Sequence, residues 1–357
     1  MELYFYAAEC GDAGRIRFRG NDQKNHNVFI DSGFERTYRS ILSKEIVSLA
    51  TNQEPIDLWI VSHIHDDHIG GAVAYIKSIL SNAIPDTVQR WHYNIPRTPI
   101  TSKTKLYQIS SPASVDQGDL LTNFLEQKEF NVQQDISTAS KPFDLFGLKL
   151  TVLSPIPLQI ETLRKKYLSG EPLERNETLS VSSAVAIKQN DYSTLVDRFD
   201  LATWEEDTSV ENGSSISVLT ELNGKKVLWL ADAFPSTVAD SLKKLGFSKE
   251  NKIKCGWVKV SHHASKANNS NTLYDLIDCN NYLISANGEN KHFLPHKECM
   301  ARILRSPSRK PETEYNFYFT HDNAILRSIF EVDGEDVYSK WNFKVHYSGS
   351  PCWSFEL

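Results

Sequence analysis

The sequence predicts an α/β fold in which helices cover β-sheets. Three observations lead to this prediction: short runs rich in Val, Ile, Leu and Trp, the Gly, Asn and Asp residues that bound these runs, and the helical stretches that separate them. Apolar runs of about five or six residues with such boundaries are typical of strands. Because strands and helices are mixed along the chain, layers of sheet and helix are expected.

Five apolar runs end on an ionisable or small polar residue. In chain order they are NVFIDSG ending at Asp31, IDLWIVSH at His63, KVLWLAD at Asp232, GWVKVSHH at His262 and NYLISAN at Asn287. We expect these strand ends to deliver their polar groups to one shared edge. Helices are expected between the strands, at residues 71–80, 236–245, 271–277 and 296–305.

The chain is long enough to bury one large core. Its 357 residues, of which 40% are hydrophobic, predict a single domain spanning residues 1–357. Residues 85–140 and 156–210 are expected to be insertions, because neither stretch continues the pattern of strand followed by polar residue, and residues 330–357 form a C-terminal extension. The five cysteines form no C-x-x-C pair and are expected to be reduced.

Charge and hydropathy limit the classes of protein to which the chain can belong. No apolar run approaches the roughly 20 residues needed to cross a bilayer, and the N-terminus lacks the basic stretch of a secretion signal, so we expect a soluble cytoplasmic protein without a membrane partner. The net charge of −6 is uneven, because residues 243–310 carry 13 Lys and Arg against 5 Asp and Glu. This segment either faces an anionic substrate or solvates ordinary surface helices.

The stretch VSHIHDDHIGG concentrates the titratable chemistry of the chain. Its His63, His65, Asp67 and His68 form an H-x-H-x-D-H motif. In an extended or tightly turned backbone the first two histidines point the same way and can share one ion, while Asp67 and His68 reach a second ion. Imidazole and carboxylate ligands without a nearby cysteine suit zinc, manganese or iron.

Two other strand ends can complete a binuclear site. Asp232 is expected to bridge the ions, and His262 or His263 is expected to add a nitrogen ligand. The sequence leaves open which of the two is the ligand; we assign His262 to the metal and His263 to proton donation or phosphate contact. Two cations lower the pKa of a shared water and neutralise charge on the substrate, and Asp67 would also orient the nucleophile.

An ordered set of further motifs accompanies SHIHDDHIGG. They are ECGDAG at residues 9–14, FIDSG at 29–33, LTVLSP at 150–155, NGSSIS at 212–217, WLADA at 229–233, HHAS at 262–265 and SANGEN at 285–290. The set resembles the metallo-β-lactamase superfamily, and within it the branch typified by the hydrolase domain of ComEC-type competence proteins. The resemblance implies an αββα sandwich of two mixed sheets covered by helices, with two divalent metal ions, zinc or manganese.

The resemblance also suggests residues around the metal ions. Asn212 and Ser215 stand in the N-x-x-S strand that replaces the third-motif histidine of other superfamily members, and Asn290 lies in the late SANGEN segment. Asp31 is expected to orient the ligand histidines by hydrogen-bonding to the side of a ring that does not face the metal ions. Ser265 either contacts a phosphate oxygen or forms a turn.

The chain departs from the branch at its G-H-P motif. The motif falls on Phe293, Leu294 and Pro295, so His292 or His296 would have to assist the leaving group. We take His296 as the candidate.

The resemblance implies phosphodiester hydrolysis, with DNA or RNA as the leading substrate, in defence or nucleic-acid turnover. The aromatic residues of QRWHYN, residues 89–94, could stack on bases or form a buried cluster. Two alternatives stay open: a small-molecule phosphodiesterase acting on a cyclic nucleotide or a phosphocholine ester, and an effector subunit controlled by a protein partner that binds the insertions.

Overall fold

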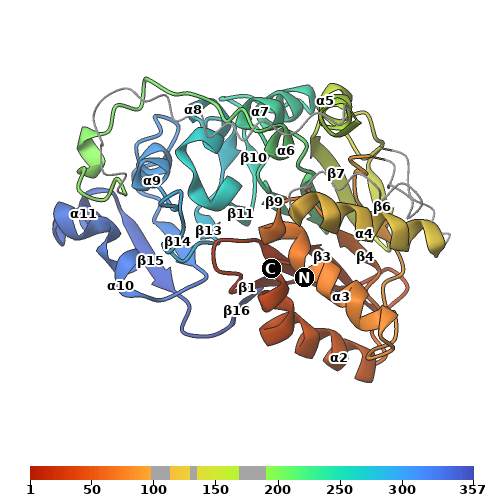
Figure 1. Cartoon of the computed structure of the whole chain (residues 1–357). Helices are drawn as coiled ribbons and strands as arrows, with labels where there is room; N and C mark the ends of the chain where they lie inside the picture. The colour runs from red at the N-terminus through yellow and green to blue at the C-terminus, as the bar shows by residue number, and fades with distance from the viewer. Residues whose placement is uncertain (98–112, 129–134, 169–189) are drawn as a thin grey trace, which may run out of the picture.

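Two mixed β-sheets pack face to face, and helices cover the outer face of each sheet (Figure 1). The structure is a computed structural model that describes residues 1–97, 113–128, 135–168 and 190–357. This arrangement confirms the predicted αββα sandwich of the metallo-β-lactamase type.

The first sheet has six strands in the order β16-β1-β2-β3-β4-β5. Strands β1 to β3 and β16 pair antiparallel, whereas β3, β4 and β5 pair parallel. The strands are β1 (Glu2–Tyr6), β2 (Ala13–Arg19), β3 (Asn25–Asp31), β4 (Leu58–Ile60), β5 (Trp91–His92) and β16 (Cys352–Glu356).

The second sheet has eight strands in the order β15-β14-β13-β11-β9-β8-β7-β6. Strands β6 to β9 pair antiparallel, and β9, β11, β13, β14 and β15 pair parallel. The strands are β6 (Phe143–Leu145), β7 (Leu148–Ser154), β8 (Ser217–Leu222), β9 (Lys225–Trp229), β11 (Trp257–Lys259), β13 (Asn281–Ile284), β14 (Tyr315–Phe319) and β15 (Phe343–Tyr347). A separate ribbon pairs β10 (Ile253–Lys254) with β12 (Ile277–Asp278).

Alternating side chains build the layers. In β3, Val28 and Ile30 face the second sheet, where they join a cluster with Val218, while Phe29 between them packs on the helices outside. Since successive strand residues point to opposite faces, a strand that is apolar throughout serves both layers. This explains why the predicted strands are apolar runs rather than alternating patterns.

Helices that cover the first sheet include α2 (Ser43–Thr51), α3 (Asp66–Leu80) and α4 (Ala113–Gln127). Helices that cover the second sheet include α7 (Pro235–Lys244), α8 (Asn271–Tyr274) and α9 (Lys297–Leu304). All four predicted helices are present, although α3 begins five residues earlier than expected, at Asp66 rather than 71, and α8 ends early. The remaining helices are α1 (Glu35–Thr37), α5 (Pro157–Leu168), α6 (Val210–Gly213), α10 (Ala324–Arg327) and α11 (Asp336–Lys340).

The structure changes two expectations about organisation. The polar strand ends come from two sheets rather than one, because β3 and β4 belong to the first sheet and β9, β11 and β13 to the second. The segment 330–357 is not a simple extension, since it adds β15 to one sheet and β16 to the other.

The insertions lie partly within the described residues. The first insertion contributes α4, whose Leu121 and Leu125 join the cluster around α3, and the second contributes α5, whose Leu163 joins the same cluster. Their segments 98–112, 129–134 and 169–189 lie outside the described residues. All five cysteines are free thiols, as predicted. Within the described ranges, we find no helix with the length and apolar character needed to cross a membrane.

Candidate metal centre

The H-x-H-x-D-H motif lies where the chain leaves β4 and enters α3. His63 and His65 occupy the extended loop, whereas Asp67 and His68 belong to the first turn of the helix, not to the loop that we expected. Negative side chains stabilise a helix N-terminus, which favours an early start at Asp66. Nε2 of His63 and Nδ1 of His65 lie 3.0 Å apart, so both rings present a nitrogen to the same small volume.

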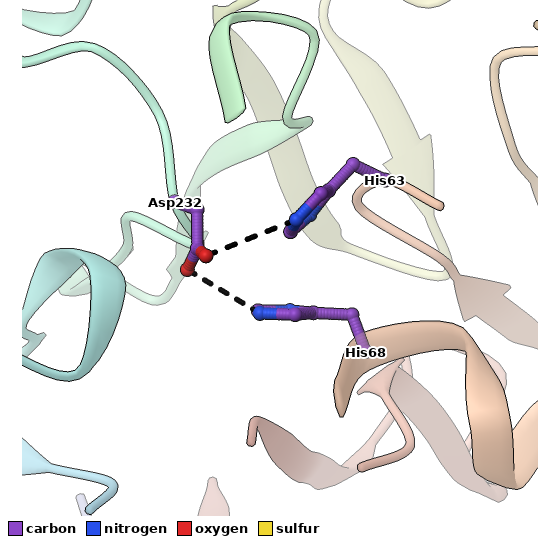
Figure 2. Close-up of side chains that lie close together, drawn as sticks. All are labelled: His63, His68 and Asp232. Atoms are coloured by element: carbon purple, nitrogen blue, oxygen red, sulfur yellow. Dashed lines mark ion pairs between the residues drawn. The ribbon is translucent and has the colours of Figure 1, made fainter. Parts of the chain in front are cut away.

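Asp232 lies at the centre of the cluster, just after β9 (Figure 2). Its Oδ2 lies 3.8 Å from Nε2 of His63 and 3.6 Å from Nε2 of His262. Its Oδ1 lies 3.4 Å from Nε2 of His68 and 3.9 Å from Nε2 of His263. The carboxylate therefore stands between two groups of imidazole nitrogens and offers one oxygen to each group.

The side chain of Asp67 belongs to the second of these groups. Its Oδ2 lies 3.2 Å from Nε2 of His263 and 3.8 Å from Nε2 of His68. Two candidate ligand sets result, and Asp232 is common to both. The first set is His63, His65 and His262, and the second set is Asp67, His68 and His263.

Both histidines of the HHAS motif reach the cluster. His262 and His263 have φ values of 44° and 52°, in the left-handed region that few residues other than glycine adopt. This unusual backbone turns two consecutive side chains toward opposite sides of Asp232. Because His263 is 1% exposed and directs Nε2 at carboxylate oxygens, its placement favours a ligand role over the proton-donor role that we assigned to it.

Polar neighbours fix the ring of His68 from behind. Asp31 accepts from Nδ1 of His68 at 2.9 Å, from the backbone N–H of Ser62 at 2.7 Å and from the Ser62 hydroxyl at 2.9 Å. The Nδ1 atom thus carries the proton, and Nε2 is free to face the cluster. This is the placement that we expected for Asp31.

A separate chain of contacts fixes His262. Its Nδ1 lies 2.7 Å from Oδ1 of Asn268, and Asp207 accepts from the Nδ2 atoms of Asn268 at 3.0 Å and Asn212 at 2.6 Å. Asn268 therefore orients the ring of His262. Asp207 lies within the second insertion, and nothing in its sequence surroundings pointed to this position.

The other predicted residues lie around the centre or stabilise loops. Nδ1 of His296 accepts from the backbone N–H of Lys266 at 3.1 Å, beside the HHAS segment. Ser265 and Ser215 are both buried, and the Ser215 hydroxyl has no hydrogen-bond partner in the described parts of the chain. Asn290 only closes its own loop, where it accepts from two backbone N–H groups.

Burial and charge act together on the titration of the cluster. Burial lowers the pKa of His63 well below its usual value, so its ring is neutral and able to coordinate a cation. Burial alone would raise the pKa of Asp232, but His262, His68 and His263 hold it well below its usual range. Burial also lowers the pKa of His68 and His263, but the neighbouring carboxylates outweigh it and raise the pKa of His68 well above its usual value and that of His263 to about 9. Because imidazole binds metal ions in its neutral form, a cation would displace a proton from each of these two rings.

Three buried atoms of the cluster have no hydrogen-bond partner among the described residues: Nε2 of His68, Oδ1 of Asp232 and Nε2 of His263. Leaving buried polar atoms unpaired is costly, and here the three atoms converge on the same small region. The mixed nitrogen and oxygen donor set suits zinc, manganese or iron. The residues therefore fit two divalent cations.

Two buried residues behind the cluster had no assigned role in the sequence. Asp12, in the GDA segment, contacts the ring of His263, and Lys259, at the end of β11, pairs with Asp12. The position of Asp12 in a family motif was a usable signal. A lysine inside an apolar strand was a second signal, because lysine is seldom fully buried without a partner.

Comparisons with known proteins agree with the motif. Residues 19–79 match the family model described as the metallo-beta-lactamase superfamily. No curated protein matches the chain.

Among solved structures, forty chains match. They include CmlA, a diiron beta-hydroxylase from Streptomyces venezuelae, and a mutant of the CmlA beta-hydroxylase. Both alignments have 10% identity and cover 100% of this chain and 54% of the other, with TM-scores of 0.40 and 0.39. This chain thus spans about half the length of those proteins.

The matched segment ends inside α3, and it contains all four residues of the H-x-H-x-D-H motif. The two-sheet sandwich and the cluster around Asp232 extend the agreement to the rest of the described chain. The protein therefore has the metallo-β-lactamase fold, and its candidate metal centre begins in the segment that matches this superfamily.

Proposed function

We propose that the protein is a metal-dependent phosphodiester hydrolase that acts on DNA or RNA. One observation carries the proposal: Asp232 offers Oδ2 to His63 and His262, and Oδ1 to His68 and His263. A carboxylate placed between two nitrogen groups suits two cations that act together. When bound, such a pair activates water and neutralises charge on the substrate oxygens, which is the chemistry that phosphodiester hydrolysis needs.

Under this proposal the chain holds its ligands rigidly before substrate arrives. Asp31 fixes His68, and Asn268 fixes His262, so two of the Nε2 atoms keep their direction without the cations. Preorganised groups lower the cost of reaching the transition state, because little rearrangement is needed when charge develops.

His296 is our candidate for protonating the leaving group. Its Nδ1 accepts from the backbone of Lys266, so the neutral ring carries its proton on Nε2. A ring held in this tautomer can donate that proton to a departing oxygen. Its position beside the HHAS segment is consistent with that role.

The choice of nucleic acid rests on the resemblance to ComEC-type hydrolase domains. Two features that were expected to favour a nucleic-acid substrate, the QRWHYN aromatic residues and the basic segment 243–310, support it less than the sequence suggested. Trp91, from QRWHYN, is buried and stacks on Trp59 with ring centroids 5.0 Å apart, so it cannot stack on a base. Nine of the 13 basic residues in 243–310 hold an ion pair or a hydrogen bond; these are Lys243, Lys249, Lys252, Lys259, Lys266, Lys297, Arg302, Arg305 and Arg309.

A small phosphodiester is the second candidate, and the pairing of these basic residues favours it. A nucleic acid needs a track of free positive charge, whereas a small ester needs only the metal ions and a few polar contacts. A protein partner that binds the insertions remains a prediction.

The test compares substrates and variants under one condition. We expect the pure protein with added manganese or zinc to cut DNA or RNA and bis-p-nitrophenyl phosphate. His63→Ala and Asp67→Ala should lose both activities. His346→Ala is the matched control, because His346 stacks on Tyr318 and hydrogen-bonds to Asn316, all outside the cluster.

Cleavage of the small ester alone would select the second candidate. A protein that cuts no phosphodiester with either metal would refute both.

A further inference from the structure

A buried lysine lies directly behind the candidate metal centre. Lys259 is 4% exposed, and its ammonium group pairs with Oδ2 of Asp12, which is itself 5% exposed. Burying two charges can cost more than their attraction returns unless their geometry is good and their remaining polar atoms are satisfied. The proposed hydrolysis gives neither residue a task.

The second oxygen of Asp12 faces a candidate ligand. Oδ1 lies 3.2 Å from Nδ1 of His263, and it has no hydrogen-bond partner in the part of the chain that the structure describes. The backbone oxygen of Ser285 lies 2.9 Å from the same Nδ1. Nδ1 therefore carries a proton toward Ser285, and Nε2 is the ring atom that faces Asp67, 3.2 Å from its Oδ2.

Asp12 also connects the segments that build the second ligand set. Its backbone N–H donates to the oxygen of Asp67 at 3.0 Å, and its own oxygen accepts from Gly33 at 2.7 Å. A side chain at Gly11 would place its Cβ 2.3 Å from the oxygen of Asp67, so only glycine permits this approach. The backbone thus holds Asp12 beside the metal loop while Lys259 fixes its carboxylate.

We propose that Asp12 is a positioning residue that strengthens His263 as a ligand, and that Lys259 holds Asp12 in place for this task. A carboxylate close to one imidazole N–H makes the opposite nitrogen a better donor to a cation. The inference rests on the proposed function, since it requires cations at the second ligand set. It assigns a role to two buried charges that lie outside both candidate ligand sets.

Two variants isolate the charge of Asp12. Lys259→Met removes the lysine alone, and Asp12→Asn with Lys259→Met removes both charges at nearly constant volume. A cavity of about 20 Å³ beside the pair gives the methionine room to repack. The matched control is Lys297→Met with Asp333→Asn, which removes another buried Lys–Asp pair far along the chain.

The measurement is cobalt(II) binding by competition with a chelator, followed together with the visible spectrum of the bound ion. We expect wild-type protein to hold two ions. The Asp12→Asn, Lys259→Met protein should hold its first ion as wild type does and its second about 10- to 100-fold more weakly. Lys259→Met alone should weaken the second ion by a smaller factor, because the Asp12 carboxylate remains but is no longer held in place. The Lys297 and Asp333 control should keep both ions at wild-type affinity.

Equal affinities in all four proteins would overturn the inference, as would an equal loss in the control. Wild-type affinity in Lys259→Met alone would overturn the role given to Lys259. If the double variant does not fold, Asp12→Asn alone gives the same comparison. A wild-type protein that binds no cobalt overturns the proposed function together with this inference. Two bound ions without cleavage of any phosphodiester would overturn the proposed function alone.

Discussion

Replacing Asp31 with alanine tests whether the structure behind His68 supports both folding and metal binding. Asp31 is 1% exposed and accepts from the Ser62 N–H at 2.7 Å, the Ser62 hydroxyl at 2.9 Å and Nδ1 of His68 at 2.9 Å. The hydroxyl can rotate to another acceptor, but the two N–H groups cannot. Each buried donor left unpaired costs about 1–3 kcal/mol, so the free energy of unfolding should fall by about 2–6 kcal/mol.

The same substitution should weaken metal binding, because His68 loses the partner that sets its tautomer. Loss of such a partner typically costs about 10- to 100-fold in metal affinity. Urea unfolding without metal measures the first effect, and chelator competition on folded protein measures the second. The expected loss of stability is a large share of the roughly 5–15 kcal/mol that stabilises a domain, so unfolding should be followed at low temperature.

Asp57→Ala is the matched control for Asp31→Ala. Asp57 accepts from the backbone N–H of Asn27 at 2.8 Å and from Nδ1 of His26 at 2.9 Å, so it makes the same two kinds of bond outside the metal cluster. We expect a similar loss of stability and unchanged metal affinity. The reasoning is refuted if Asp31→Ala unfolds like wild type, or if Asp57→Ala weakens metal binding as strongly.

Four further outcomes are expected. Burial lowers the pKa of His26, but the hydrogen bonds of this ring to Asp22 and Asp57 outweigh burial and raise the pKa above 6.5. The stability that protonated His26 contributes is therefore complete below pH 6.5 and is lost as the pH rises through the raised pKa. In urea unfolding measured across pH, His26→Asn should remove this pH dependence. Lys297→Met leaves Asp333 buried without its cation and should lower the free energy of unfolding by about 3–5 kcal/mol, whereas adding Asp333→Asn should restore much of it in thermal unfolding. Gly71→Ala places a Cβ 2.3 Å from the backbone oxygen of Ser32, so α3 must move away from β3. This substitution should destabilise the protein by about 1–3 kcal/mol and weaken metal binding. An unchanged melting temperature would contradict this expectation. Removal of metal with a chelator should abolish hydrolysis and lower the melting temperature, and manganese or zinc should restore both, as scanning calorimetry and the ester assay would show.

Local patterns were sufficient to predict much of the fold. The apolar runs that end at Asp31, His63 and Asp232 contain strands, because their short length, their Val, Ile and Trp content and the turn formers around them favour strands over helices. The density of the H-x-H-x-D-H motif likewise marked a metal site before any tertiary contact was known. We did not predict that α3 begins within this motif, because a loop and the first turn of a helix have similar residue patterns.

Pairing between distant segments decided the rest. No local signal indicates that residues 352–356 would pair with residues 2–6 at the edge of the first sheet, because strand partners are chosen by the packing of whole layers. The same holds for Asp207, which reaches His262 from an insertion, and for the basic residues of 243–310, many of which pair instead of facing a ligand.

The sequence by itself determined that this chain forms layered sheets and that one short segment gathers ligands for metal ions, since both follow from spacing along the backbone. Only the tertiary structure decided that His262 and His263 both reach Asp232, from opposite sides. That outcome depends on two left-handed residues and on the parallel pairing of β9 with β11, and neither is encoded in the spacing of the residues that meet.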